Sequence, residues 1–283
     1  MTTLSRRIGA ALMTPALAAM ALLAASPPAL AAQLTDTGDS TRPAFYQAPS
    51  PLPAANGALV RAEPEPFYLD PANLSGVAVT SQRIMYKTTN RTGAPAAVTG
   101  TVIVPTTPWV GAGSRPLISF AVGTQGLADR CAPSRLLSFA QEYEEVFAGA
   151  LLGRGYAVAI TDYEGLGTAG VHTYMDRVSQ GHAVLDVARA ALQLPNTGLG
   201  ADTPIGLAGY SQGGGASAAA GELAPSYAPE LAIKGIAPGA VPADLKATGA
   251  NLDGGPYAEF MLYAVDGLSS SYGIDPAGTL RSE

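Results

Sequence analysis

The sequence predicts an α/β fold in which helices cover both faces of a central, mostly parallel β-sheet. Two patterns lead to this prediction: an antiparallel hairpin comes first, and short apolar strand segments then alternate with segments of helical periodicity. A third pattern supports the same fold: a Gly-x-Ser-x-Gly pentapeptide at 209–213 joins one of those strand segments to a helix candidate. The 283-residue chain is 47% hydrophobic and 13% charged, which suffices for a buried core and excludes a largely disordered protein.

Residues 1–31 are predicted to be an export signal that takes no part in the fold. Arg6 and Arg7 form a positive start, residues 8–25 are an apolar stretch, and residues 29–31 offer a small-x-small cleavage site. A membrane-spanning helix is the alternative, which glycine and proline interruptions disfavour. The mature chain is therefore expected to be secreted, without a transmembrane segment.

Residues 32–66 are rich in proline, which withholds a backbone donor and fixes φ. We expect an extended arm or linker there, with the folded core beginning at residue 67. The hairpin follows: β-branched strand segments at 77–86 and 97–104 flank a polar turn at 90–93.

Beyond the hairpin, buried strands are expected at short apolar segments, and helices where apolar residues recur every three to four positions. The strand segments are 116–122, 156–161, 204–209 and 233–241. Three helices are expected. The first has an apolar stripe from Tyr143 to Leu151 and ends at Gly153, and the third is a small-residue helix over 213–223. The second is indicated by the apolar stripe Ala183, Val184, Val187, Ala188 and Ala191.

Ser211, at the centre of the pentapeptide, is the candidate nucleophile. In a nucleophile elbow, a sharp turn from strand to helix holds the serine in a strained conformation, and flanking glycines remove Cβ atoms that would collide with neighbouring backbone. The turn also sets the serine at a helix N-terminus, so that the N–H of Gln212 points at a developing oxyanion. A structural Gly-Ser turn is the alternative, since the chain holds 33 glycines.

A second oxyanion donor is expected in the loop after an earlier strand. The Gly123-Thr124-Gln125-Gly126 loop follows the segment 116–122, and its glycines permit close backbone approach. Gln125, by its backbone or its side chain, is the candidate, and an ordinary strand-end turn is the alternative.

Other polar residues are given structural roles. Asp162 and Glu164 follow the segment 156–161 at the sheet edge where α/β sites gather; we expect them to brace loops around the elbow, with orientation of a base as the alternative. Cys131 is expected to be a structural cysteine, because nothing near it in the sequence would activate a thiolate.

Composition excludes several functions. The 16 Lys and Arg are scattered among 22 Asp and Glu, for a net charge of −6, so a nucleic-acid-binding surface is disfavoured. One cysteine and two histidines rule out a disulfide scaffold and the usual zinc spacings. No cofactor and no metal are therefore predicted.

The pentapeptide, the segment 123–134 with its Cys-Ala-Pro-Ser, the loop 162–167 and the Ser-Tyr-Ala-Pro-Glu-Leu stretch at 226–231 resemble the secretory lipase family of fungi and bacteria. The resemblance covers roughly residues 66 to 275. It implies an α/β-hydrolase fold, a Ser-Asp-His triad, a cap inserted after the sixth strand, and activity on triacylglycerols and other lipid esters. By position, Ser211 matches the family nucleophile, Gln212 the backbone oxyanion donor, and Gln125 falls at or beside the second donor.

The same resemblance divides the chain into a hydrolase core at 67–250 and the start of a cap at 251–283. In this fold the triad order is serine, acid, histidine, yet both His172 and His182 precede Ser211. About forty residues follow the segment 233–241, too few for a cap and two further strand-helix units. We therefore expect a chain that stops inside the cap and lacks the last strands, with triad acid and base unassigned.

Neither histidine is a strong substitute for the missing base. His182 shares a helix face with Asp186 and Arg189, which is typical of a solvated polar surface. His172 lies in a loop at the carboxyl side of the sheet and could approach the site.

The resulting hypothesis is a secreted serine esterase or triacylglycerol lipase that acts through an acyl-enzyme at Ser211, with reduced or no activity in a truncated chain. Its partners would be a lipid ester substrate and, transiently, a lipid–water interface. The alternatives are a cutinase-like short-chain esterase, a non-catalytic lipid-binding remnant and an inert remnant.

Overall fold

The structure is a computed structural model, and it describes residues 42–69 and 78–275. These belong to one compact unit, Arg42–Glu283. The predicted export signal and residues 32–41 of the predicted arm lie outside the described residues. No helix within the described ranges is both long and apolar enough to span a bilayer.

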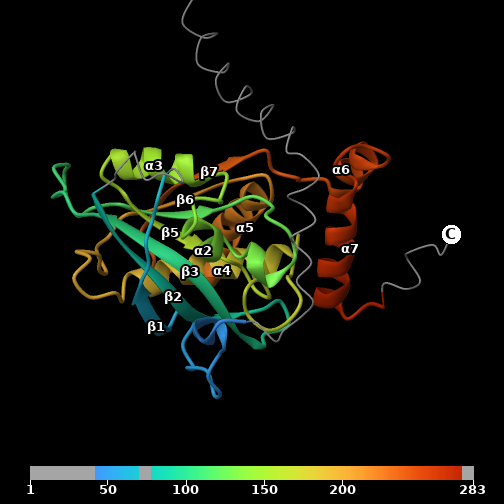
Figure 1. The fold of residues 1–283 in the computed structure, drawn as a ribbon, viewed down its shortest axis with the longest axis horizontal. Helices are drawn as coiled ribbons and strands as arrows, with labels where there is room; N and C mark the ends of the chain where they lie inside the picture. The colour runs from blue at the N-terminus through green and yellow to red at the C-terminus, as the bar shows by residue number, and fades with distance from the viewer. Residues whose placement is uncertain (1–41, 70–77, 276–283) are drawn as a thin grey trace, which may run out of the picture. The chain divides into compact units, whose positions relative to one another are not determined.

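A seven-stranded mixed sheet forms the centre of the unit, with strand order β1-β2-β3-β5-β4-β6-β7 (Figure 1). The pairs β1–β2, β2–β3 and β3–β5 are antiparallel, whereas β4 pairs in parallel with both β5 and β6, and β6 with β7. The strands are β1 Leu59–Pro64, β2 Val79–Thr89, β3 Pro95–Pro105, β4 Leu117–Ala121, β5 Ala157–Thr161, β6 Ile205–Tyr210 and β7 Ile233–Gly239.

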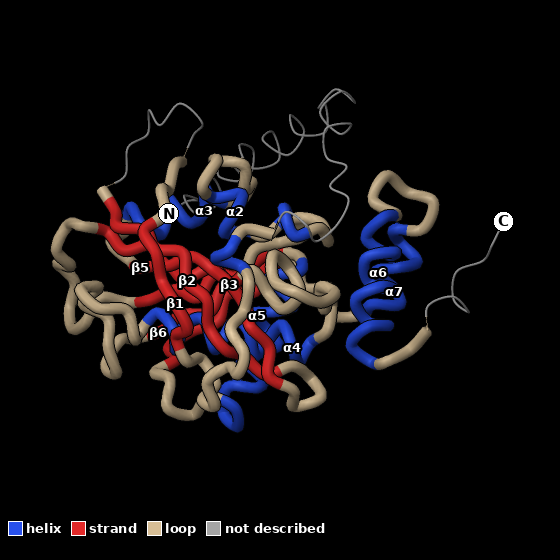
Figure 2. The backbone as a smooth tube through the Cα atoms, turned by 60° about the horizontal axis from the view of Figure 1, so that its bottom comes forward, coloured by secondary structure: helices blue, strands red, loops and turns tan. Residues whose placement is uncertain are grey.

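The helices form layers on the two faces of the sheet, as Figure 2 shows. The helices α4 and α5 pack together and cover β4 from one face, and α2 and α3 lie against β3 and β5 on the other. Two further helices, α6 and α7, follow β7. The bounds are α2 Pro133–Leu137, α3 Glu145–Gly153, α4 Arg177–Ala191, α5 Gln212–Tyr227, α6 Leu245–Leu252 and α7 Glu259–Tyr272; short 3-10 turns occupy Ala44–Tyr46 and Asp129–Cys131.

The core is built by the β-branched and small side chains that the alternating pattern identified. All five residues of β5 are buried, and Val184, Val187 and Ala188 of α4 are fully inaccessible. Parallel strands are apolar throughout when helices cover both faces of the sheet, because the side chains on both faces are then buried. The predicted α/β architecture is confirmed, and its parallel half brings the carboxyl ends of β4, β5 and β6 to one edge.

Part of the predicted arm is structured, so the expected core boundary at residue 67 is wrong. Leu59–Pro64 is the edge strand β1, and Tyr46 is buried with its hydroxyl bonded to Ser134 Oγ at 2.8 Å. An edge strand tolerates a terminal proline because one side of it needs no ladder donors. Proline content alone therefore misassigned the segment.

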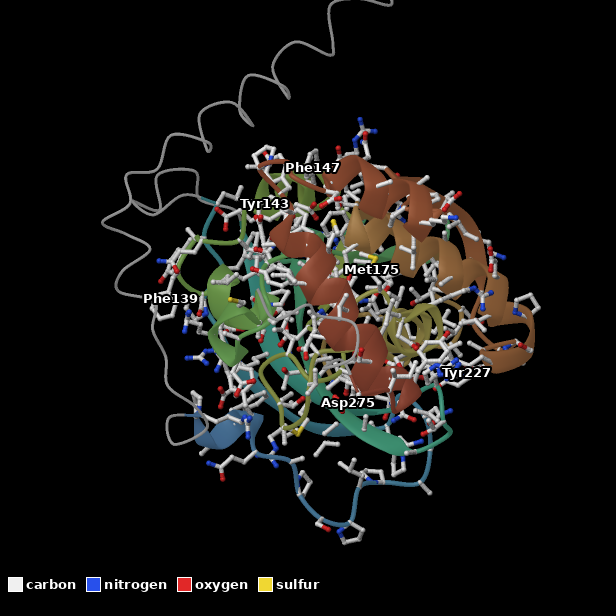
Figure 3. All side chains as sticks on the ribbon, turned by 90° about the vertical axis from the view of Figure 1, so that its right-hand side faces the viewer. Phe139, Tyr143, Phe147, Met175, Tyr227 and Asp275 are labelled. Carbon is white, nitrogen blue, oxygen red and sulfur yellow. The ribbon has the colours of Figure 1, made fainter. Side chains whose placement is uncertain are left out.

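Two predicted helix faces are also wrong. In and before α3, Tyr143, Val146 and Phe147 of the expected core stripe are exposed; Tyr143 and Phe147 are labelled in the upper part of Figure 3. On α4, Asp186 is fully buried where a solvated face was expected. It accepts hydrogen bonds from Thr88 Oγ1, Tyr227 Oη and Arg189 Nη1 at 2.6, 2.7 and 2.8 Å.

Candidate active site

The pentapeptide forms a strand-to-helix elbow. β6 ends at Tyr210, Ser211 has φ 55° and ψ −117°, and α5 begins at Gln212. A positive φ is unfavourable for a serine and persists only where the surroundings impose it. Here the Ser211 N–H donates to the Gly239 carbonyl at the end of β7 at 3.0 Å. The geometry matches the strained elbow that the sequence predicted.

Glycines are required on both sides of Ser211. A Cβ at Gly209 would lie 2.5 Å from the Ala121 carbonyl oxygen, and one at Gly213 would overlap the same oxygen. A Cβ at Gly214 would overlap the carbonyl oxygen of Gly239. The first turn of α5 is therefore packed directly on the backbone ends of β4 and β7. This close approach fixes Ser211 at the carboxyl edge of the parallel strands, where its backbone neighbour Gln212 begins the helix.

His172 contacts the elbow through a side chain of the elbow itself. Its Nε2 lies 2.9 Å from Gln212 Nε2, and its Nδ1 lies 3.0 Å from the Glu164 carbonyl oxygen. Because the amide NH₂ of Gln212 donates, the imidazole must be neutral and protonated on Nδ1, which then donates to Glu164. Burial lowers the pKa of His172 to about 4, consistent with that neutral tautomer. His172 therefore lies close to the elbow, as the sequence allowed, but its ring is hydrogen-bonded to Gln212 and not to Ser211.

The other histidine lies away from the elbow. His182 stacks on Tyr227 with ring centroids 3.6 Å apart, and its Nδ1 contacts the Thr89 carbonyl at 2.6 Å. Each of the two histidines therefore has a ring nitrogen bonded to a group other than Ser211.

The loop 123–126 follows β4 and lies beside the segment that leads into α3. Gln125 Nε2 donates to Glu142 Oε1 at 2.7 Å, and the Gly123 N–H donates to Glu144 Oε2 at 3.0 Å. The side chain of Gln125 is thus committed to Glu142, which leaves its backbone N–H as the possible oxyanion donor. Sequence reasoning missed both glutamates; a run of acidic residues inside an otherwise apolar helical segment was the available signal.

Asp162 joins the end of β5 to α2 and β3, whereas the sequence led us to expect a brace for the loops around the elbow. It is fully buried and accepts bonds from Ser134 N at 2.7 Å and Thr99 Oγ1 at 2.6 Å. Desolvation raises its pKa to about 6. Cys131 is a free cysteine whose thiol pKa is raised by burial, which is the opposite of thiolate activation.

Helix α7 borders the loop that carries His172. Gly267 packs so closely on Tyr174 that a Cβ would lie 2.5 Å from the Tyr174 nitrogen, and the rings of Tyr263 and Tyr174 are 6.1 Å apart. The guanidinium of Arg91 lies 3.5 Å from the centroid of the Tyr272 ring. Figure 3 looks onto this helix from outside the core.

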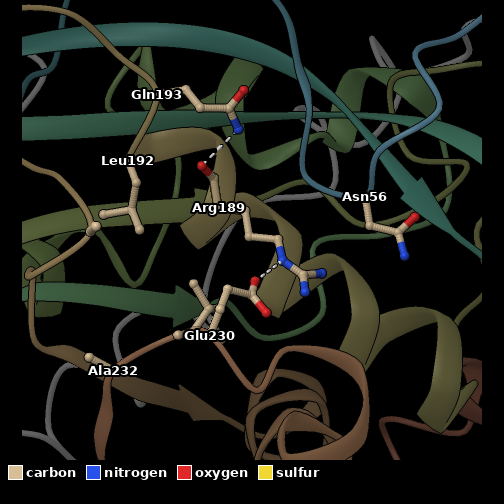
Figure 4. Close-up of a pocket in the computed structure, with 8 residues that line it drawn as sticks. Asn56, Arg189, Leu192, Gln193, Glu230 and Ala232 are labelled. Carbon is tan, nitrogen blue, oxygen red and sulfur yellow. Dashed lines mark hydrogen bonds and ion pairs between the residues drawn. The ribbon is translucent and has the colours of Figure 1, made fainter.

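A pocket of about 390 Å³ lies at the other end of the strands. Its lining includes Arg189, Gln193 and Glu230, with Ala232 just before β7 (Figure 4). Arg189 Nε donates to Glu230 Oε1 at 2.6 Å. Because Ala232 precedes the amino end of β7 and Ser211 follows the carboxyl end of β6, this pocket is separate from the elbow.

An elbow of this geometry on a mixed sheet with parallel strands at the site defines an α/β-hydrolase. Comparison with known proteins makes the assignment narrower: the model of the secretory lipase family matches residues 131–274. Lipase A of Moesziomyces aphidis is 34% identical over 268 residues, which are 89% of this chain and 55% of that protein. The chain belongs to the secretory lipase family.

Two other similarities show how the chain relates to longer proteins. A probable inactive lipase of Mycobacterium tuberculosis is 37% identical over 201 residues, 69% of this chain and 44% of that protein. The closed state of Candida antarctica lipase A superposes with a TM-score of 0.69 at 30% identity, over 82% of this chain and 53% of that one. The chain spans about half the length of these relatives.

Proposed function

We propose that the protein is a secreted hydrolase of lipid esters in which Ser211 is the nucleophile. The observation that carries this proposal is the strained φ of 55° at Ser211 between β6 and α5. The secretory lipase family and relatives named secreted triacylglycerol lipases in Malassezia support lipid esters as the substrate and the extracellular space as its location.

In the proposed reaction, Ser211 Oγ attacks the ester carbonyl carbon and its proton passes to a base. The negative charge on the carbonyl oxygen is then held by the backbone N–H groups of Gln212 and Gln125. Collapse of this tetrahedral intermediate expels the alcohol, and water hydrolyses the acyl-enzyme to release the fatty acid.

Within the described residues, no histidine is placed to accept the proton of Ser211. Both ring nitrogens of His172 are bonded, to Gln212 and Glu164. His182 stacks on Tyr227 at the opposite end of α5 from Ser211, so neither imidazole is placed to act on Ser211. A serine hydroxyl without a base is a weak nucleophile at neutral pH. Oxyanion stabilisation and binding alone, without a base in reach of Ser211, would supply about 10³–10⁴-fold over water.

Labelling with a fluorophosphonate, followed by peptide mapping, tests the nucleophile, with Ser211→Ala as the control. Hydrolysis of a short-chain and a long-chain p-nitrophenyl ester should rise when imidazole is added as an external base, beyond the imidazole-catalysed rate with Ser211→Ala. Absence of both labelling and rescue would refute a serine mechanism.

A lipid-binding protein without catalysis is the second candidate, favoured by the engaged histidines and by the relative named a probable inactive lipase. It predicts saturable binding of a fluorescent fatty acid to a protein that the fluorophosphonate leaves unlabelled.

A further inference from the structure

Three consecutive residues before α3 contact three consecutive residues of the loop after β4, in antiparallel order. Glu142 accepts from Gln125 Nε2 at 2.7 Å, the Tyr143 hydroxyl lies 3.4 Å from the Thr124 carbonyl oxygen, and Glu144 accepts from the Gly123 N–H at 3.0 Å. The two segments are thereby held together residue by residue.

The fit between these segments is tight. A Cβ at Gly123 would lie 2.9 Å from Glu144 Oε1 and would overlap the Tyr143 hydroxyl. Glu142 and Glu144 are each only 1% exposed. One oxygen of each, Glu142 Oε2 and Glu144 Oε1, is buried with no partner among the described residues. Burying an unpartnered oxygen costs free energy in either form of the carboxyl, but the cost is much larger for the charged carboxylate than for the neutral acid, so this burial favours the protonated form.

The loop that these glutamates hold carries the candidate oxyanion donor. Among the hydrogen bonds within residues 42–69 and 78–275, none uses the backbone N–H of Gln125. We propose that Glu142 and Glu144 are positioning residues: in their protonated form they hold the 123–126 loop so that the Gln125 N–H faces an oxyanion, and loss of their protons disables the site. This inference rests on the proposed serine mechanism.

Burial shifts the pKa values of both glutamates into the pH range in which a change of protonation could control the site. Desolvation raises the pKa of Glu142 to about 8 and that of Glu144 to about 7. The Glu144 carboxyl itself raises the pKa of Glu142, which a hydrogen bond from the Glu144 backbone lowers. The other groups that interact electrostatically with the pair are Glu145, Tyr143 and Tyr163, with Tyr174 and Tyr210 facing Tyr143. All are neutral or negative, and no lysine or arginine of the described chain is among them. Ionisation would therefore place negative charge beside the position of a negatively charged intermediate.

The test is the rate of fluorophosphonate labelling of Ser211 between about pH 6 and about pH 9 in wild type, Glu142→Gln, Glu144→Gln and the double variant. Glutamine keeps an acceptor oxygen and imitates the protonated acid. At about pH 6, wild type and the double variant should label equally fast. At about pH 9, wild type should label at least about tenfold more slowly than the double variant. Complete loss of one oxyanion donor slows a reaction about 10²–10³-fold, so a roughly tenfold effect corresponds to partial loss. Glu142→Leu, which has no acceptor for Gln125, should label slowly at every pH.

The matched control is Glu222→Gln, which removes an exposed carboxylate paired with Arg177 on the surface and should reproduce the wild-type profile. Parallel profiles for wild type and the double glutamine variant would overturn the positioning role while leaving Ser211 as nucleophile. No labelling of wild type at any pH would instead refute the serine mechanism. Infrared spectroscopy adds a second measurement: wild type should show, at about pH 6.5, protonated carboxyl absorption that is lost by about pH 9 and is absent from the double glutamine variant. Equal bands in the two proteins at about pH 6.5 would contradict the inference.

Discussion

Adding one methyl group at Gly213 should damage the protein more than adding it two residues further along the same helix. A Cβ at Gly213 would overlap the Ala121 carbonyl oxygen and lie 2.8 Å from the Val122 carbonyl oxygen. All of these atoms are backbone at the end of β4, so no side chain can turn aside. At Gly215 the nearest atoms are Pro242 carbons at 3.5 and 3.7 Å, which is ordinary contact.

The comparison separates steric overlap from helix propensity. Alanine replaces glycine favourably in a helix by up to about 1 kcal/mol, and this term acts at both positions. Gly215→Ala should therefore stabilise the protein by roughly 0.5–1 kcal/mol. Gly213→Ala should lose about 1–3 kcal/mol, since overpacking forces the backbone to move. The two variants should differ by about 1.5–4 kcal/mol.

Urea denaturation followed by circular dichroism at 222 nm measures both free energies of unfolding, provided the m-values agree. Labelling of Ser211 should also be slower in Gly213→Ala, because the displaced end of β4 leads into the 123–126 loop. Equal stability of Gly213→Ala and Gly215→Ala would refute the packing that we describe around the elbow.

Three further outcomes are expected. His172 has a folded-state pKa of about 4, below its unfolded value of 6.5, so the unfolded state binds a proton first and stability should fall as pH drops from about 6.5 to about 4. His172→Gln should remove this component, on the order of 3 kcal/mol at most, and pH-dependent urea melts measure it. Asp186→Ala removes the buried acceptor of three donors, Thr88, Arg189 and Tyr227, and should cost about 3–5 kcal/mol. Glu222→Ala, at an exposed pair, should cost less than about 1 kcal/mol; similar losses in the two would contradict the network around Asp186. Cys131 should react with iodoacetamide more slowly than a free thiol at about pH 8, since burial raises its pKa; a faster reaction would be incompatible with its surroundings.

The strands and the elbow were predictable because they depend on local patterns. Apolar segments of the observed strand lengths, and glycines at 209 and 213, are visible in the sequence, and the structure places β5, β6 and Ser211 where those patterns indicated. Backbone approach at Gly213 follows from the motif itself, so no tertiary information was needed.

The errors occurred where tertiary contacts outweigh periodicity. The apolar stripe around Tyr143 predicted a buried face, yet the neighbouring loop after β4 buries Glu142 and Glu144 instead, because its donors require acceptors. Asp186 resembled a surface residue until Thr88 and Tyr227, distant in sequence, supplied its partners. Periodicity identifies a helix face, but it does not identify which polar groups will find partners in the interior.

The first turn of α5 is held between the carbonyl of Ala121 at the end of β4 and the carbonyl of Gly239 at the end of β7. Ser211 therefore behaves as a fixed point to which a substrate must adapt. Changes in substrate preference then have to come from the segments around it, such as the loop at 171–176 and α7, which meet at Tyr174. For protein engineering, this makes the elbow a constant part and those neighbouring segments the region in which variation is tolerable.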